Sequence, residues 1–331
     1  MISVAMCTFN GERYLPEQLE SFAKQTRPPD EVVICDDQSS DNTLALIRQF
    51  AAAFRVRVES NAQQLGSMKN FEKAIGLCAG DIIVLADQDD VWLSNKLQCL
   101  EAEFERAPEV GLVFSDAELI DDEGQGLGRR LWEQIGLGDT ERARLNGGNG
   151  LIDLLRGATA TGATLAFRAK YKSLILPIPE NLTVIHDAWI ALIVSCVARV
   201  LPLDQPLVQY RQHPLQQVGP RRRLTAPGGL GAVVAGQAGD AASRANPYDA
   251  TLTLARAASA RLTEVSREFD GQRAKRQLGA MIKHLEARAH LTQSLVPRMP
   301  LVLRELLTLR YWRFSNGISS AVKDLFYGSL S

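Results

Sequence analysis

Short apolar runs alternate with amphipathic stretches over the first hundred residues. The pattern predicts strands at 2–6, 31–35, 56–58 and 81–86, and helices at 15–23, 42–50, 68–79 and 91–104. Strands joined by single helices need crossover connections, so we expect an α/β fold with a mostly parallel central sheet and flanking helices. In such sheets ligands bind at the carboxyl ends of the strands.

The pattern changes after a further strand at 110–114. Residues 121–150 are rich in glycine and charge and predict a loop, followed by a strand at 159–167 and a buried helix at 187–197. Residues 221–248 lack periodicity and predict a linker, whereas helical spacing returns over 249–331. We expect Pro297 and Pro300 to separate that helical run from a last basic amphipathic stretch at 301–314.

Composition places the chain among ordinary globular proteins. Its 331 residues are 46% hydrophobic and 23% charged, and the five cysteines are odd in number and scattered. This favours reduced cysteines and a cytoplasmic protein. We expect no signal peptide, and the longest apolar stretch, 189–203, is too short to span a bilayer.

The net charge of −1 hides an asymmetry along the chain. Residues 221–331 hold 17 basic and 8 acidic side chains, whereas the first 220 residues hold 20 and 30. No nucleic-acid-reading motif accompanies the basic part, so we expect no nucleic-acid partner. Two interpretations remain open: peripheral contact with an anionic membrane face, or a solvated helical surface that packs against the acidic body.

Acidic clusters follow the predicted strands. Asp36 and Asp37 follow the second strand, where they could bind a nucleoside hydroxyl or base, or simply cap a turn. The run 87–90, Asp-Gln-Asp-Asp, follows a wholly apolar strand. Crowded carboxylates repel one another unless a cation offsets them, and hard oxygen ligands suit Mg²⁺ or Mn²⁺. The alternative is an exposed acidic turn.

Two later clusters are less specific. Asp187, after His186, is either the N-cap of an apolar helix or a general base at a pocket rim. Trp189 could stack on a sugar, although such a residue more often belongs to the core. The segment 210–213, Tyr-Arg-Gln-His, puts an aromatic ring, a cation and a metal-ligand type side by side.

The order of these segments resembles family-two glycosyltransferases of the GT-A fold, particularly bacterial rhamnosyltransferase-like members. The matching segments are Val-Ala-Met-Cys-Thr-Phe-Asn-Gly (4–11), Val-Ile-Cys-Asp-Asp-Gln-Ser-Ser-Asp-Asn-Thr (33–43), Asn-Phe-Glu-Lys-Ala (70–74), Asp-Gln-Asp-Asp-Val-Trp (87–92), Thr-Gly-Ala-Thr (161–164), His-Asp-Ala-Trp (186–189) and Tyr-Arg-Gln-His (210–213). The resemblance implies a GT-A domain at 1–220, with a nucleotide-sugar half (1–115) and an acceptor half (116–220). A linker (221–248) and a helical basic region (249–331) would follow.

The resemblance also implies roles for single residues. Asp187 would be the catalytic base of an inverting transfer. Asp87 and Asp89 match the DXD motif and would bind Mg²⁺ or Mn²⁺ with His213. Residues at the nucleotide-sugar donor would be Thr8, Asn10, Asp36, Asp37, Lys69, Asp87 and Arg211, with Arg211 and His213 closing over the diphosphate, and those at the acceptor His186 and Trp189.

Partners and location follow from the same resemblance. We expect a nucleotide-diphosphate sugar donor, with rhamnose as the first choice of sugar, and a glycan or lipid-linked acceptor in surface polysaccharide synthesis. The protein would work in the cytoplasm, peripherally at the inner membrane face, and a homodimer is left open. Pro214 stands where relatives have glycine, which puts the mobility of the closing loop in doubt.

Rival functions make different demands on the sequence. A catalytically inactive sugar-nucleotide-binding or interaction protein on the same fold would predict loss of Asp87, Asp89 or Asp187, and all three are present. A nucleotidyltransferase would need a glycine-rich phosphate loop after the first strand. The segment 7–12, Cys-Thr-Phe-Asn-Gly-Glu, lacks that pattern.

Overall fold

The chain divides into two compact units in the computed structural model. The structure describes residues 1–51, 55–157, 160–182, 184–214, 216, 248–291 and 294–327. The sheet unit comprises Met1–Gly150, Thr159–Ile178 and Ile185–Arg222, and the helical unit comprises Leu151–Ala158, Pro179–Val184 and Arg223–Ser331. The predicted linker at 221–248 lies outside the described residues, except for Tyr248.

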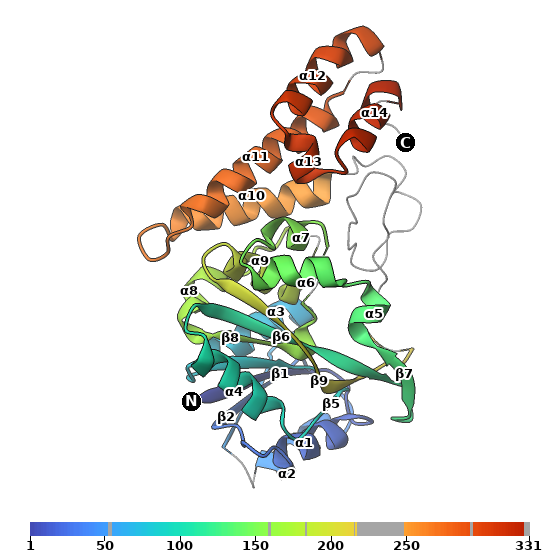
Figure 1. Ribbon diagram of the computed structural model, residues 1–331. Coiled ribbons are helices and arrows are strands. Elements are labelled where there is room, and N and C mark those ends of the chain that lie inside the picture. The colour runs from blue at the N-terminus through green and yellow to red at the C-terminus, as the bar shows by residue number, and fades with distance from the viewer. Residues whose placement is uncertain are drawn as a thin grey trace. The chain divides into compact units, whose positions relative to one another are not determined.

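A nine-stranded sheet forms the centre of the sheet unit. Its path runs β3-β2-β1-β4-β8-β6-β9-β5, and β7 pairs with β6 beside that path (Figure 1). The strands are β1 (Ile2–Thr8), β2 (Glu31–Asp36), β3 (Val56–Ser60), β4 (Ile82–Ala86), β5 (Val91–Trp92), β6 (Val110–Ile120), β7 (Gly126–Arg130), β8 (Leu165–Arg168) and β9 (Arg199–Arg211). The buried apolar residues of β1, β2 and β4 supply much of the core.

The first half of the sheet is parallel, in the order β3-β2-β1-β4. Its register brings Thr8 beside Asp36, and Met6 beside Ala86. The loops that follow these strands therefore leave the sheet at one edge. The α/β class predicted from the alternating pattern is confirmed.

Helices lie on both sides of this sheet (Figure 1). Those of the sheet unit are α1 (Leu15–Ala23), α2 (Thr43–Ala51), α3 (Gly66–Leu77), α4 (Lys96–Arg106), α5 (Leu131–Ile135), α6 (Asp139–Asn146), α8 (Lys172–Ile175) and α9 (His186–Ser195), with 3-10 turns η1 (Gly162–Thr164) and η2 (Ala169–Tyr171). The helix expected at 91–104 begins only at Lys96, because Val91 and Trp92 pair with β9 as a short strand.

In the second half of the sheet unit, one expectation was wrong and one strand was not predicted. Residues 121–150 are not one loop: they include β7, α5 and α6. The long strand β9 was not predicted at all. It contains Pro202 and Pro206, and Pro206 aligns where the β6–β9 register shifts. Proline is tolerated in sheets at such irregularities, so the proline-interrupted pattern concealed a strand.

The helical unit contains α7 (Leu151–Leu155), α10 (Asp249–Glu264), α11 (Gln272–Ala289), α12 (Leu295–Leu307), α13 (Arg310–Phe314) and α14 (Ile318–Tyr327). Pro297 and Pro300 do not precede the last amphipathic helix, as expected, but lie within α12. Pro297 is in the first turn, where backbone N–H groups have no helical partner. None of the described helices is long and apolar enough to cross a membrane.

Candidate active site

Side-chain amides tie together the loops at the carboxyl edge of the parallel strands. Phe9 N donates to Gln88 Oε1 at 2.8 Å, and Gln88 Nε2 donates back to Phe9 O at 3.0 Å. Gln18, fully buried on α1, donates from Nε2 to Asp87 O at 2.9 Å. The loops after β1 and β4 are thereby held in one arrangement. An added Cβ at Gly11 would lie 2.4 Å from Gln88 Oε1, so glycine allows this approach.

The two carboxylates of the first acidic cluster, Asp36 and Asp37, are both buried and have different hydrogen-bond partners. Asp36 is fully buried and accepts hydrogen bonds from Thr8 Oγ1, Ser39 Oγ and Ser39 N. It therefore supports the turn and is shielded from a ligand. Asp37 lies one residue further along, and it accepts from the backbone N–H groups of Leu65 and Gly66 at 2.8 Å.

A polar chain that the sequence reasoning did not assign completes the surroundings of Asp37. Asn61 Nδ2 donates to Asp37 Oδ1 at 2.8 Å and to Asn70 Oδ1 at 2.9 Å. Lys73 Nζ donates to Asn61 Oδ1 at 2.8 Å, which brings a cation to the same cluster. Asn70 and Lys73 belong to the segment 70–74 that carried part of the family resemblance. Their polarity on a helix with an apolar face was the available signal.

Three other residues predicted at the donor have structural partners. Thr8 is 2% exposed and its hydroxyl donates to Asp36 at 2.8 Å, so it supports the turn. Asn10 lies on the exposed loop with a φ of 48°, and its Oδ1 accepts from Ser40 N. Lys69 pairs with Glu72 at 3.1 Å. Of these three, Asn10 is the exposed residue on the loop beside the Asp37 cluster.

Carboxylates gather where β4 ends, as the motif predicts. Desolvation and the neighbouring carboxylates of Asp89 and Asp187 raise the pKa of Asp87. Asp90 is 1% exposed, and burial raises its pKa well above the ordinary value, with Asp89 and Asp87 adding to the shift. Asp90 Oδ2 has no hydrogen-bond partner among the described residues. Ionising these carboxyl groups together in a poorly solvated place is costly, and a nearby cation would offset that cost.

A buried lysine that the sequence analysis did not single out lies against this cluster. Lys96, the first residue of α4, has no exposed surface; its Nζ donates to Ala163 O at 2.7 Å and lies 3.7 Å from the ring centroid of Trp92. Burial lowers the pKa of Lys96 well below its ordinary value, although Asp90 and Asp87 oppose that shift. A largely desolvated amine compensates the acids incompletely.

Two of the predicted metal ligands meet in the structure. His213 Nε2 and Asp89 Oδ2 are 2.9 Å apart, and the His213 ring packs on Tyr14 with centroids 4.6 Å apart. Neighbouring ligands of an octahedral Mg²⁺ at about 2.1 Å are about 3 Å apart, so this pair has suitable spacing. Among the described residues no group of three or more His, Cys, Asp or Glu side chains is arranged to hold a metal by itself. The residues fit an ion that takes further oxygen ligands from a diphosphate or water.

Protein groups contact the side chain of Arg211, which was predicted at the donor. Its side chain is 1% exposed, and Nε donates to Asp89 O at 2.9 Å. The terminal nitrogens donate to Glu17 Oε2 at 2.6 Å and to Asp122 O at 3.2 Å, and the backbone N–H donates to Asp90 Oδ1. Arg211 therefore connects the end of β9 to the loop at residues 87–90 through hydrogen bonds. Spacing in the sequence could not reveal this, because the partners come from three separate segments.

Asp187 lies within electrostatic range of Asp87, which brings the predicted base to the acidic cluster. It is 4% exposed at the start of α9, and its Oδ2 accepts from Gly162 N at 2.9 Å. Burial raises the pKa of Asp187 to about 6, despite the backbone N–H groups that oppose the shift. Its carboxylate is thus more basic than an ordinary aspartate and still ionised at neutral pH, as a general base requires.

The two residues expected at the acceptor behave differently. The ring of His186 stacks on Phe71 with centroids 4.0 Å apart, and neither ring nitrogen has a partner among the described residues. Burial lowers the pKa of His186 to about 3, so the ring is neutral. Trp189 is fully buried, and its indole N–H donates to Ile175 O at 2.9 Å. Trp189 is a core residue in this structure, which is the alternative that the sequence analysis favoured.

Replacing Arg211 tests its structural role. In Arg211→Ala, Asp89 O, Asp122 O and Glu17 lose their buried partner, and we expect a loss of about 3–5 kcal/mol in the free energy of unfolding. Urea unfolding followed by tryptophan fluorescence measures this loss. Arg106→Ala removes a cation that is 68% exposed and is expected to change little. An unchanged midpoint for Arg211→Ala would instead return this residue to a ligand-binding role.

Comparisons with known proteins find similar sequences for the first part of the chain. Residues 3–152 match the sequence model of glycosyl transferase family 2. The chain is 27% identical over 122 residues to the Escherichia coli UDP-Glc:alpha-D-GlcNAc-diphosphoundecaprenol beta-1,3-glucosyltransferase WfgD, covering 37% of this chain and 47% of that protein. It is 33% identical over 99 residues to the Shigella flexneri dTDP-rhamnosyl transferase RfbG, covering 28% of this chain and 34% of that protein.

A similar solved structure supports the fold. Staphylococcus aureus TarS, residues 1–349, superposes with a TM-score of 0.54 at 17% sequence identity, over 98% of this chain and 80% of that one. This likeness concerns the fold alone. The chain spans less than half the length of the two curated relatives described above. The matched segment is just under half of the chain and is similar to glycosyl transferase family 2, and the described sheet and helices have the GT-A fold.

Proposed function

We propose that this protein is an inverting, metal-dependent glycosyltransferase that moves a sugar from a nucleotide diphosphate to an acceptor hydroxyl. The observation that carries the proposal is the approach of Asp187 to the Asp87–Asp90 cluster. These carboxylates are a hundred residues apart in the sequence, yet the Asp187 carboxylate is one of the causes that raise the pKa of Asp87. A base for the acceptor and ligands for a diphosphate-bound cation are the two groups that such a transfer needs.

The donor site is proposed around Asp37 and the edge of β4. Asp37, supported by Asn61 and Lys73, would receive the nucleoside, with Asn10 on the adjoining loop. Asp89 and His213, with Asp87 nearby, would hold Mg²⁺ or Mn²⁺ against the diphosphate. When bound, the ion supplies positive charge where the leaving diphosphate becomes more negative.

The chain's own residues then direct the acceptor. Asp187 accepts the proton of the acceptor hydroxyl as that oxygen bonds to the anomeric carbon. The bond from this carbon to the diphosphate oxygen breaks on the opposite side, and the nucleoside diphosphate leaves. A single displacement of this kind inverts the anomeric centre. The Gly162 N–H fixes the orientation of the Asp187 carboxylate, and the neutral, unpartnered His186 beside it is positioned to bind an acceptor hydroxyl.

The identity of the substrates rests on the relatives. RfbG is named a dTDP-rhamnosyl transferase and WfgD acts on a diphosphoundecaprenol-linked sugar. We therefore propose dTDP-rhamnose as donor and a glycan or lipid-linked glycan as acceptor, in surface polysaccharide synthesis at the cytoplasmic face of a membrane. A catalytically inactive sugar-nucleotide-binding protein on the same fold is the second candidate, and the experiments below separate the two.

Removal of one metal ligand tests the cation site. Asp89→Asn keeps the shape but removes the charge that faces His213, so we expect Mn²⁺ affinity and nucleotide release from the donor to fall at least a hundredfold. Isothermal titration calorimetry and a coupled nucleotide-release assay measure these two quantities. Glu105→Gln, an exposed neutralisation on α4, is the matched control. Equal Mn²⁺ binding by Asp89→Asn and the control would exclude this site.

The raised pKa of Asp187 predicts the pH dependence of transfer. Because the ionised form is the base, kcat/KM should be half its plateau near pH 6 and fall about tenfold for each unit below that. A profile from pH 4.5 to 8.5 at saturating Mn²⁺ measures it. Asp187→Asn should bind donor normally and lose transfer about a thousandfold.

Protein stability provides a control for the same group. The pKa of Asp187 is about 6 in the folded state and 3.8 in the unfolded state. Because the folded state binds the proton more tightly, this carboxyl stabilises the fold most at a pH below 3.8. The wild type should therefore lose about 2–3 kcal/mol relative to Asp187→Asn as pH rises from 4 to 6, and no more above. A difference in stability that does not change with pH would show that Asp187 titrates normally.

A donor panel separates transfer from mere binding. The protein is incubated with dTDP-rhamnose, UDP-glucose, UDP-GlcNAc and GDP-mannose, with and without Mn²⁺, and nucleotide release is measured. We expect release from dTDP-rhamnose with metal and at least tenfold less from the others. Binding of a donor without release from any, even with lipid-linked acceptor added, would favour the inactive binding protein.

A further inference from the structure

Exposed apolar side chains are concentrated in the last described part of the helical unit. Of the twelve large hydrophobic side chains that are exposed among the described residues, ten lie between Leu295 and Phe326. They are Leu295, Val296, Met299, Leu303, Leu307, Leu309, Trp312, Ile318, Val322 and Phe326, and we call the surface that they form the α12–α14 surface.

Helical spacing collects these residues on the outer sides of two helices. On α12 the exposed residues Val296, Met299, Leu303 and Leu307 recur at three and four, and on α14 Ile318, Val322 and Phe326 recur at four. A neighbouring side of each helix, about 100° around its axis, carries Val302 and Ala321, which belong to one buried cluster. The apolar rows are therefore additional to the rows that make the core.

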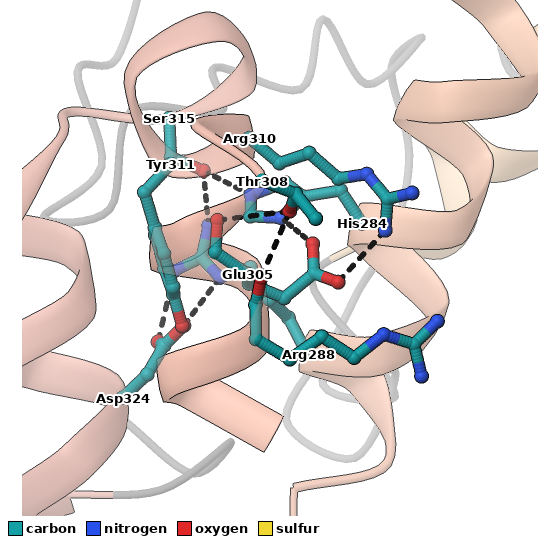
Figure 2. A network of polar contacts seen from close by, with 9 residues as sticks. His284, Arg288, Glu305, Thr308, Arg310, Tyr311, Ser315 and Asp324 are labelled. Atoms are coloured by element: carbon teal, nitrogen blue, oxygen red, sulfur yellow. Dashed lines mark hydrogen bonds and ion pairs between the residues drawn. The ribbon is translucent and has the colours of Figure 1, made fainter. Parts of the chain in front are cut away.

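The interior of this part is unusually polar, as Figure 2 shows. Arg288 donates from Nε and Nη2 to the two carboxylate oxygens of Asp324, at 2.6 and 2.9 Å, and from Nη1 to Ser315 Oγ at 2.7 Å. His284 lies between Glu305, at 2.7 Å, and Ser315, at 2.9 Å. Each of these groups is nine-tenths buried or more. Charged groups are thus inside and leucines outside, the reverse of a soluble helix bundle.

The charges that remain outside have one sign. Residues 294–327 contain two acidic side chains, Glu305 and Asp324, and both are buried in ion pairs. Arg304 and Arg313 are exposed, and Lys323 is half-buried. Every exposed charge of this segment is therefore positive. A surface that joins exposed leucine, tryptophan and phenylalanine with cations alone is complementary to anionic lipid headgroups above acyl chains.

We propose that the α12–α14 surface docks on an anionic lipid bilayer, with its apolar side chains in the headgroup region. The inference rests on the proposed function only in that a lipid-linked acceptor would be met at such a bilayer. The polar network of Figure 2 supports the docking, because it consumes both acidic groups and fixes the helices with their apolar rows outward. Binding is interfacial, in keeping with described helices that are too short or too polar to span.

Vesicle co-sedimentation of the full chain tests the proposal. Vesicles of phosphatidylcholine with 30 mol% phosphatidylglycerol are compared with phosphatidylcholine alone, without donor or metal. We expect binding to the anionic vesicles that weakens with salt, and at least tenfold weaker binding to the neutral ones. Leu303→Ser/Leu307→Ser should weaken anionic-vesicle binding at least tenfold, since both side chains are more than half exposed and their loss leaves the core intact.

The contribution of the exposed arginines to vesicle binding is tested with a matched control variant. Arg304→Gln/Arg313→Gln should weaken binding about fivefold for each charge removed. Arg267→Gln/Arg276→Gln removes two exposed cations from the α10–α11 turn and the first half of α11, and should leave binding within twofold of the wild type. Equal losses in the two double variants would overturn the proposal, because attraction would then follow net charge and not this surface.

Other results of these experiments distinguish membrane docking from dimerisation and from a failure of the proposed function. If the wild type does not bind anionic vesicles but forms a dimer that Leu303→Ser/Leu307→Ser dissociates in analytical ultracentrifugation, a second copy covers the surface and the proposal is wrong. Asp89→Asn should bind vesicles as the wild type does. Vesicle binding without sugar transfer would refute only the proposed function, and transfer in solution without vesicle binding would refute only the docking surface.

Discussion

Electrostatic repulsion among the acids that follow β4 is the constraint on which the sheet unit depends. Asp87, Asp89 and Asp90 occupy consecutive or alternate positions at the end of a wholly buried strand, where water cannot separate their charges well. Hydrogen bonds hold the loop in place against this repulsion. Gln18 and Gln88 fix its backbone, and Arg211 connects β9 to the same loop. Ionising these acids together costs stability unless a cation is near, and this is the physical basis of the proposed metal site.

The members of two adjacent pairs, Asp36–Asp37 and His186–Asp187, differ in their hydrogen-bond partners or in their pKa shifts. Asp36 and Asp37 are neighbours in a turn, yet Asp36 accepts its bonds inside the turn while Asp37 faces the polar chain of Asn61 and Lys73. His186 and Asp187 are likewise adjacent, with a neutral ring and a carboxylate whose basicity is raised. Burial moves the pKa of an acid up and that of a base down, so one desolvated place makes both residues ready to accept a hydrogen bond.

The helical unit shows the opposite use of buried charge. There Arg288 and Asp324 form a bidentate pair, and the network neutralises its acids internally. Buried pairs contribute little net stability, but they specify how helices dock. In the sheet unit a cation would have to offset the acids for all of them to ionise. In the helical unit buried partners satisfy the acids, and the exterior is cationic and apolar.

The sequence alone determined the α/β class, the similarity to glycosyl transferase family 2 and the positions of the acidic clusters, because strand–helix alternation and motif order are local properties. It also predicted Asp87, Asp89, His213 and Asp187 as one group, and the structure brings them to one edge. Tertiary contacts decided the rest. Arg211 and Trp189 have the residue types of ligands, but partners from distant segments place one behind the loop and the other in the core. The sequence analysis did not identify Lys96, Asn61 or the proline-containing strand β9 for the same reason. Their environments depend on contacts between segments that are distant in the sequence, and a local pattern does not contain this information.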